Sequence, residues 1–179
     1  MSTGLIFLDF DGVLTSERVN IAQNYDYDIW SKFDSVAIDF FNKLHDTYNL
    51  NFVWNTTWMH GMKEHDKMTF HWMQTMFRNS GFRGTFADPW RVNPDDKDYS
   101  IIYGCNSRNY RAHQVKEYMT NYHLAAYNAK RYMCFDDIDF GYNNILNAKR
   151  FIKTDSDNGM LNHHYKRALA LASCVFDKE

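Results

Sequence analysis

Two aspartates near the start of the chain, Asp9 and Asp11, have a spacing that lets side chains act together. The apolar run over residues 5–9 predicts a buried strand of a parallel sheet that ends on Asp9. Because residues i and i+2 of an extended chain project the same way, the two carboxylates are expected to stand side by side. Gly12 permits a sharp turn directly after them. Such a pair favours a shared proton or a cation such as Mg²⁺, although a surface turn without a ligand explains the same residues.

Polar pairs also follow two later stretches that have the character of strands. They are Thr56-Thr57 after residues 51–55 and Asp136-Asp137 after residues 132–135. The carboxyl ends of parallel strands share one edge of a sheet, and open α/β sheets bind their ligands at that edge. We therefore expect carboxylates from two strands to enclose one Mg²⁺, with a hydroxyl and a cationic side chain completing the site.

Helices are expected between these strands. Apolar residues at helical spacing predict four of them, over residues 34–48, 65–79, 111–122 and 162–173. Asp34 or Ser35 is expected to cap the first helix, and Val36 and Trp72 are expected to face the core. Strands that alternate with helices predict an α/β fold with a parallel, Rossmann-like sheet, and a short strand is expected at residues 150–153.

Two segments lack a regular pattern. Residues 15–32 are expected to form a loop that folds over the aspartates, and residues 82–110 to be irregular apart from a possible strand at 99–103. We expect a single domain over residues 1–179, with loop-like or cap-like insertions near these two segments.

Composition limits the class of protein. The chain has 179 residues, of which 45% are hydrophobic and 23% charged, as in a globular domain. The formal net charge of −2 gives no basic footprint for duplex nucleic acid. We expect neither a signal peptide nor a membrane span. Three widely spaced cysteines, Cys105, Cys134 and Cys174, are expected to be reduced, as in a cytoplasmic protein, with Cys134 in a strand.

The motifs resemble those of the haloacid dehalogenase (HAD) superfamily of phosphatases. Its first motif resembles residues 9–14, its second the strand that ends in Thr56, and its fourth the strand that ends in Asp136-Asp137. The third motif is a Lys or Arg near the start of the preceding helix, a place that Arg111 holds and for which Lys116 is the alternative. We favour Thr56 over Thr57 because of the motif match, since neighbouring strand residues face opposite ways.

One small-domain branch of that superfamily is similar over most of the chain. This branch includes phosphatase domains of RNA-repair proteins and carries an Arg-Gly-x-Glu-Ile-x-x-Trp-Leu pattern, which resembles residues 111–119. Ala112 and Gln114 replace its Gly and Glu. The stretch from residue 151 to His163 resembles the tail of the branch. The resemblance implies a minimal cap.

The resemblance also implies roles. Asp9 would be the nucleophile that forms an aspartyl-phosphate, and Asp11 would be the general acid and then the base. Thr56 would hydrogen-bond the phosphoryl group, and Arg111 or Lys116 would balance its charge. The ligands of Mg²⁺ would be Asp9, the Asp11 carbonyl, Asp136 and Asp137. The substrate would contact Gly12, Thr57 and Trp58.

These features predict a Mg²⁺-dependent phosphomonoesterase acting on a nucleotide or a nucleic-acid end. A short cap leaves the site open to large substrates, whereas Tyr25, Tyr27, Trp90 and Arg91 suit a base and its phosphate. Trp54 and Trp58 are either core residues or stacking platforms. The alternatives are a sugar-phosphate phosphatase, and a catalytically silent domain of the same fold that binds nucleotides or regulates.

Overall fold

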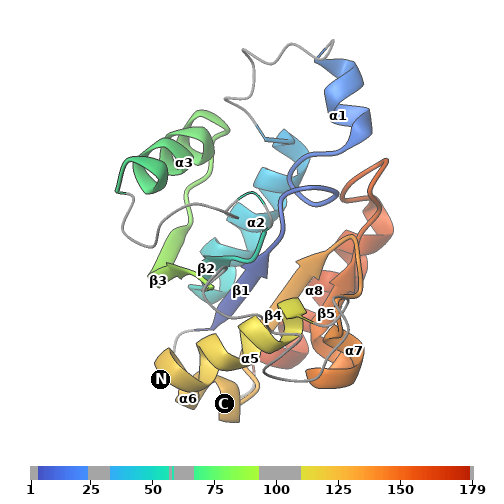
Figure 1. Ribbon diagram of the computed structural model, residues 1–179. Coiled ribbons are helices and arrows are strands. Elements are labelled where there is room, and N and C mark those ends of the chain that lie inside the picture. Colours follow the sequence, from blue (N-terminus) through green and yellow to red (C-terminus); the bar gives the residue numbers. More distant parts are fainter. Residues whose placement is uncertain (1–3, 24–32, 57, 59–66, 93–109, 178–179) are drawn as a thin grey trace.

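Five parallel strands form the single sheet of the computed structural model, which describes residues 4–23, 33–56, 58, 67–92 and 110–177. In chain order the strands are β1 (Leu5–Leu8), β2 (Asn51–Trp54), β3 (Thr85–Arg91), β4 (Tyr132–Asp136) and β5 (Phe151–Lys153). In space their order is β3-β2-β1-β4-β5, with β1 in the centre (Figure 1). The predicted Rossmann-like α/β fold is confirmed.

Helices connect and cover these strands. They are α1 (Glu17–Ala22), α2 (Ser35–Tyr48), α3 (Lys67–Asn79), α5 (Tyr110–Tyr122), α6 (Leu124–Asn128), α7 (Tyr142–Ile145), the 3₁₀ turn η3 (Ala148–Arg150) and α8 (Asn162–Phe176). The Asp34 side chain caps α2 as expected, because its carboxylate accepts a hydrogen bond of 3.0 Å from the backbone N–H of Val36. The four helices expected from periodicity are therefore present.

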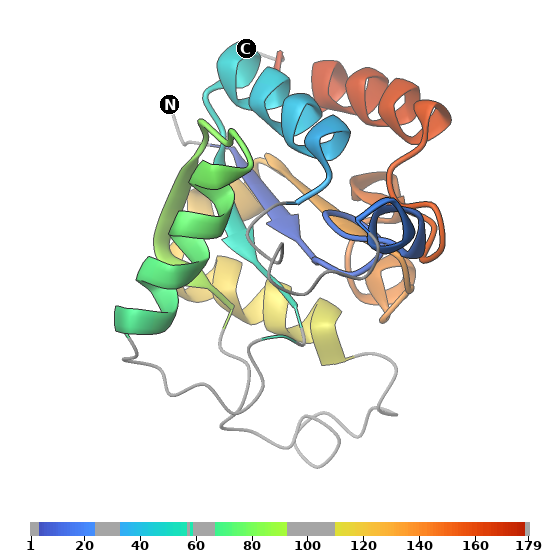
Figure 2. The same cartoon turned by 90° about the horizontal axis from the view of Figure 1, so that it is seen from above.

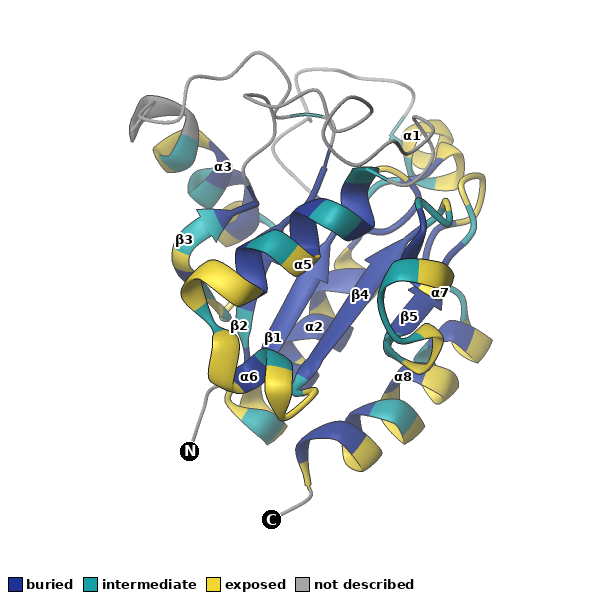
Figure 3. Cartoon of the chain, turned by 60° about the horizontal axis from the view of Figure 1, so that its bottom comes forward, coloured by how far each residue is buried: buried dark blue, intermediate teal, exposed yellow. Residues whose placement is uncertain are grey.

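Alternate residues of β1 pack into two separate hydrophobic cores, one on each face of the sheet. Ile6 and Leu8 pack into a cluster with α2, α3 and α8, whereas Leu5 and Phe7 pack into a second cluster with α5, α6 and α7. Seen from above, α2 and α8 lie on one side of the sheet and α5 lies on the other (Figure 2). The central strands are buried on both faces (Figure 3), which explains why β1 is apolar at every position.

Strand order creates a switch point beside β1. The chain first runs outward from β1 through β2 to β3, and then crosses to the other side of β1 to form β4 and β5. Leu8 is in register with Trp54 of β2 and with Phe135 of β4. The next residue of β1, Asp9, is therefore level with the ends of both neighbours, where a doubly wound sheet leaves a crevice for ligands.

Several elements were not predicted. Helix α1 lies within the expected loop 15–32, and β3 lies within the segment 82–110 that we expected to be irregular. Strand β3 contains Pro89, which weakens the sequence pattern of a strand but is tolerated because β3 is an edge strand. The short helices α6 and α7 span too few residues to show a period. The strand expected at 99–103 lies outside the described residues.

Two side chains that we expected in the core are exposed. Val36 is 49% exposed in the first turn of α2, where it borders an open groove against α8. Trp72 is 48% exposed, because the buried stripe of α3 is centred on Met73, Met76 and Phe77 and leaves Trp72 at its margin.

Cys134 lies buried in β4 as expected, and burial raises the pKa of its thiol. Cys174 is an exposed free thiol on α8, and Cys105 lies outside the described residues. Among the helices that the structure describes, none combines the length and the hydropathy needed to cross a lipid bilayer.

Candidate active site

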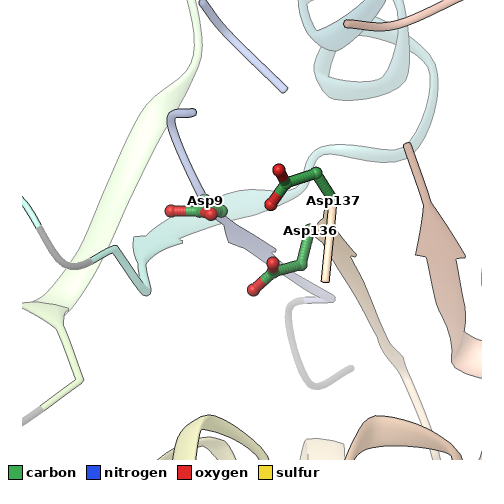
Figure 4. Close-up of side chains that lie close together, drawn as sticks. All are labelled: Asp9, Asp136 and Asp137. Atoms are coloured by element: carbon green, nitrogen blue, oxygen red, sulfur yellow. The ribbon is translucent and has the colours of Figure 1, made fainter. Parts of the chain in front are cut away.

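Three aspartates from two strand ends come together at the switch point. Asp9 follows β1, Asp136 is the last residue of β4, and Asp137 follows it. One carboxylate oxygen of each lies within 4.8 Å of the others, and the close-up shows the three side chains close together at the strand ends (Figure 4). Asp9 is 3% exposed and Asp136 is fully buried, while Asp137 is half-buried. Three of the four predicted metal ligands are thus within reach of one ion.

Arg111 joins two of these carboxylates. Its Nη1 lies 2.7 Å from Asp9 Oδ2 and 2.6 Å from Asp136 Oδ2. The guanidinium is buried in the first turn of α5, and its central carbon lies 4.6 Å from the ring centroid of Phe140. Of the two candidate cations, Lys116 lies exposed further along α5. Arg111 therefore places a buried positive charge between two carboxylates of the cluster.

Burial and charge together shift the protonation of this cluster. Burial, reinforced by the charge of Asp9, raises the pKa of Asp136 to about 8. Burial also raises the pKa of Asp9, against the charge and hydrogen bond of Arg111 and a hydrogen bond from Thr56. Burial raises the pKa of Asp137 as well. Burial lowers the pKa of Arg111, but the negative charges of Asp136 and Asp9 raise this pKa by more than burial lowers it. The guanidinium therefore stays charged.

One oxygen of Asp9 lacks an ordinary hydrogen-bond partner among the described residues. Asp9 Oδ1 is buried and makes no hydrogen bond of ordinary geometry to any residue that the structure describes. An unpaired buried carboxylate oxygen is costly, so a cation at this position would be stabilising. When all three carboxylates are ionised, one guanidinium leaves two negative charges uncompensated, which suits a divalent ion.

Asp11 lies in different surroundings from Asp9. Its side chain is exposed and is not part of the three-carboxylate cluster. Its Oδ2 accepts a hydrogen bond of 2.8 Å from the indole Nε1 of Trp58, and its Oδ1 accepts one of 3.3 Å from the Thr15 hydroxyl. These contacts fix the Asp11 carboxylate on the exposed side of the site, which Asp11, Thr15 and Trp58 form and which we call its mouth. A group in this position can exchange a proton with a substrate or with water.

Thr56 lies directly after Asn55 at the end of β2, and its side chain is buried. Its hydroxyl oxygen accepts a hydrogen bond of 3.3 Å from the backbone N–H of Trp58. Thr56 also lies close enough to Asp9 to lower the pKa of that carboxyl, so it stands between Asp9 and the backbone of Trp58. Thr57, its alternative, lies outside the described residues.

Gly12 brings the first loop against Asp137. Its φ of +68° is a left-handed conformation that favours glycine. A Cβ at this position would lie 2.5 Å from the Cβ of Asp137 and 2.9 Å from its Oδ2. Only glycine permits so close an approach, and this contact was not predicted.

The tryptophans that we considered for stacking differ in exposure. Trp54 is fully buried, with its ring stacked on Phe77 at 5.7 Å, so it belongs to the core. Trp58 is half-buried, and its ring meets Phe10 edge to face at 5.4 Å. Trp90 packs against Trp54, Arg91 is buried beside it, and Tyr25 and Tyr27 lie outside the described residues.

Sequence reasoning missed two residues that support the cluster. The Tyr142 hydroxyl donates a hydrogen bond of 3.0 Å to Asp136 Oδ2 and accepts one of 2.6 Å from Asn55 Nδ2. Burial and the charge of Asp136 raise the pKa of Tyr142. Asn55 had a signal, because it directly precedes Thr56, whereas nothing in the pattern around Tyr142 indicated a role.

Comparison with known protein families gives one match. The family model described as "HAD domain in Swiss Army Knife RNA repair proteins" matches residues 5–165. The matched region contains every site residue discussed above. Neither the comparison with curated proteins nor that with solved structures gives a match.

Proposed function

The chain belongs to the family of HAD domains in Swiss Army Knife RNA repair proteins, and we propose that it is a Mg²⁺-dependent phosphomonoesterase that reacts through Asp9. The strongest support is the arrangement of Arg111, whose Nη1 lies 2.7 Å from Asp9 and 2.6 Å from Asp136. Two buried carboxylates and a buried guanidinium at the edge of a sheet are costly for stability alone, which favours a role in function.

The donor set fits Mg²⁺. Asp9, Asp136 and Asp137 would hold the ion, since carboxylate oxygens are the ligands that Mg²⁺ prefers and Asp9 Oδ1 has no other ordinary partner among the described residues. When bound, the ion offsets the negative charge of the carboxylates and of the phosphate and polarises the phosphoryl oxygens.

Asp9 would act as the nucleophile. Its carboxylate attacks phosphorus, an O–P bond forms to Asp9, and the bond from phosphorus to the leaving oxygen breaks. Arg111 and the Thr56 hydroxyl lie beside Asp9, where they can stabilise negative charge on the transferring group. Water then attacks the aspartyl-phosphate, which releases phosphate and restores Asp9.

Asp11 would move the protons. It gives a proton to the leaving oxygen in the first step and takes one from the attacking water in the second. Its exposed position at the mouth of the site, between Trp58 and Thr15, supports this division of labour. The buried aspartate would carry the covalent chemistry and the exposed one the proton transfers.

The proposed substrate is a nucleotide or a nucleic-acid end. The family description refers to RNA repair proteins, and a phosphate at a nucleic-acid end would be a substrate consistent with that description. The half-buried Trp58 beside Asp11 offers an aromatic surface at the mouth, which suits a nucleoside leaving group.

Release of phosphate from an aryl phosphate, with and without Mg²⁺, tests the reaction. Activity should require Mg²⁺ and should fall on the order of 10⁴-fold or more in Asp9→Asn, which keeps the size of the side chain but removes the nucleophile. Asp39→Asn, a change of an exposed aspartate on α2, is the matched control and should remain active. Full activity in Asp9→Asn would remove the nucleophile from the proposal.

A panel of nucleoside monophosphates, 3′-phosphorylated oligonucleotides and sugar phosphates tests the substrate. Turnover should be fastest with one of the first two classes. Turnover of sugar phosphates alone would refute the proposed substrate. Tight nucleotide binding without phosphate release would instead identify a silent binding domain.

A further inference from the structure

Tyr142 lies behind the carboxylate cluster, where its hydroxyl joins two strand ends. The side chain is buried at the start of α7. An amide N–H can only donate, so the phenolic oxygen accepts the hydrogen bond of Asn55 at 2.6 Å. The hydroxyl hydrogen of Tyr142 is then directed to Asp136 Oδ2 at 3.0 Å. Two hydrogen bonds in series therefore end on a carboxylate of the cluster.

This pair of hydrogen bonds crosses the central strand. Asn55 follows β2 and Asp136 ends β4, and these strands flank β1 on opposite sides. Tyr142 belongs to the core on the α5 side of the sheet, so the link lies on that side. A displacement of either strand end would therefore change the position of the Asp136 carboxylate.

The ring of Tyr142 is held firmly. It stacks on Phe151 of β5, with the ring centroids 4.7 Å apart and an angle of 22° between the ring planes. Gly141, with a φ of +88°, makes the turn that starts α7 and directs Tyr142 inward. Because the ring cannot move freely, its hydroxyl provides a fixed point for the carboxylate.

Asp136 shares its other strong donor with Asp9. Arg111 Nη1 bonds to Asp136 Oδ2 and also to Asp9 Oδ2, so its pull is divided between the two carboxylates. The backbone N–H of Ile138 bonds to Asp136 Oδ1 at 3.0 Å. Without the Tyr142 hydroxyl, Oδ2 of Asp136 would be held by the shared guanidinium alone and could turn with it.

We propose that Tyr142, supported by Asn55, is a positioning residue that holds Asp136 in the orientation needed to bind a divalent cation together with Asp9 and Asp137. The inference rests on the proposed function, since it assigns a role in metal binding to a residue that touches the ligand and not the ion. Loss of such a supporting partner typically lowers metal affinity about 10- to 100-fold.

Tyr142→Phe removes the hydroxyl and keeps the stacked ring. Its matched control is Tyr132→Phe, because Tyr132 is also a buried tyrosine and lies on β4, but the groups that shift the pKa of its hydroxyl include no carboxylate of the cluster. Both variants lose one buried hydroxyl, and only the first loses a bond to a metal-binding carboxylate. A purely structural role for Tyr142 would affect the two variants alike.

Calorimetric titration of the metal-stripped full chain with Mg²⁺, beside urea unfolding in EDTA, tests the proposal. The dissociation constant should rise about tenfold or more in Tyr142→Phe and stay unchanged in Tyr132→Phe, while both lose similar metal-free stability. Asn55→Ala should show a smaller rise. The double variant Asn55→Ala/Tyr142→Phe should bind Mg²⁺ no more weakly than Tyr142→Phe, because Asn55 acts through Tyr142.

Two results would overturn the proposal. One is a wild-type affinity for Mg²⁺ in Tyr142→Phe. The other is an equal loss of Mg²⁺ affinity in Tyr142→Phe and Tyr132→Phe. If Tyr142→Phe did not fold, wild-type affinity in Asn55→Ala would overturn it instead. A wild-type chain that bound no Mg²⁺ would overturn both this inference and the metal requirement of the proposed reaction, whereas wild-type binding with an unaffected Tyr142→Phe would overturn this inference alone.

Discussion

Asp9 and Asp11 are two residues apart in the chain and yet lie in opposite environments. Asp9 is buried beside Arg111 and Asp136, and its position follows from the register of β1 with its two neighbouring strands. Asp11 is exposed and is held by Trp58 and Thr15, which lie on loops. The sheet therefore positions the buried carboxylates of Asp9 and Asp136, which together with Arg111 we call the floor of the site. The loops position the residues of its mouth, which are Asp11, Thr15 and Trp58. Changes to the floor should lower the free energy of unfolding and the turnover of every substrate. Changes to the mouth should lower the turnover of only some substrates.

Among the residues that surround the proposed nucleophile, Arg111→Met in the floor should have the largest effect. Removal of one partner from a buried ion pair leaves the carboxylates unpaired, which typically costs about 3–5 kcal/mol. Urea unfolding in EDTA should show a loss of this size, and phosphate release should fall by about 10² or more. Lys116→Met, at an exposed position of the same helix, should change the free energy of unfolding by less than about 0.5 kcal/mol. Equal effects of the two changes would contradict the assignment of Arg111.

Thr56→Val tests the boundary between floor and mouth. The change keeps the branched shape of the side chain but removes the hydroxyl beside Asp9. Loss of one preorganised donor should lower the rate constant of turnover by about 10²-fold with every substrate. Thr56→Ser keeps the hydroxyl and should retain most of the activity. A Thr56→Val enzyme with wild-type turnover would exclude Thr56 from the reaction.

Trp58→Phe should affect the mouth alone. It keeps an aromatic ring against Phe10 but removes the N–H that holds Asp11 Oδ2. Proton donation matters most when the leaving group is poor, so turnover of alkyl phosphates should fall by about tenfold while that of an activated aryl phosphate is unchanged. An equal loss with both substrate classes would show that Trp58 does not act through Asp11.

The smallest effect should be a pH dependence of metal binding. Burial, with the charge of Asp9, raises the pKa of Asp136 to about 8 in the metal-free chain, well above its value when unfolded. The stability that the protonated group provides should be lost as pH rises through about 8, and Mg²⁺ should then bind more tightly because it no longer competes with a proton. The rise in Tm on adding Mg²⁺ should be larger at about pH 9 than at about pH 6. Equal rises at both pH values would contradict the assignment of Asp136 as a ligand.

The sequence predicted the floor better than the mouth for a physical reason. Strand ends are marked by apolar runs, and parallel strands bring their ends to one edge, so Asp9 and Asp136 could be paired across more than 120 residues. The Asp11 carboxylate was expected to stand beside that of Asp9 because strand alternation was extended past the strand. The chain leaves the strand after Leu8, and the alternation ends with it.

Arg111 and Lys116 illustrate a choice that the sequence left open. Five helical residues separate their side chains by about 7.5 Å along the axis and about 140° around it, so only one can face the carboxylates. Which one does so depends on where α5 begins relative to the sheet edge. The structure begins α5 at Tyr110, which places Arg111 in the first turn beside Asp9.

The remaining misses share a cause. Strand β3 forms because β2 offers it a partner, despite Pro89. Tyr142 reaches Asp136 because α7 packs against α5 and the Tyr142 ring stacks on Phe151 of β5. Such contacts arise from tertiary packing, which overrides weak local patterns and leaves no period in the sequence.

The covalent role of Asp9 can be tested by trapping the intermediate. The full chain is mixed with an aryl phosphate and Mg²⁺, quenched in acid during turnover, reduced with borohydride and digested for mass spectrometry. An aspartyl-phosphate at Asp9 would appear as conversion of that residue to its alcohol, only when Mg²⁺ and substrate are both present. Rapid phosphate release with Asp9 left unmodified, or with the modification on another aspartate, would contradict the proposed reaction.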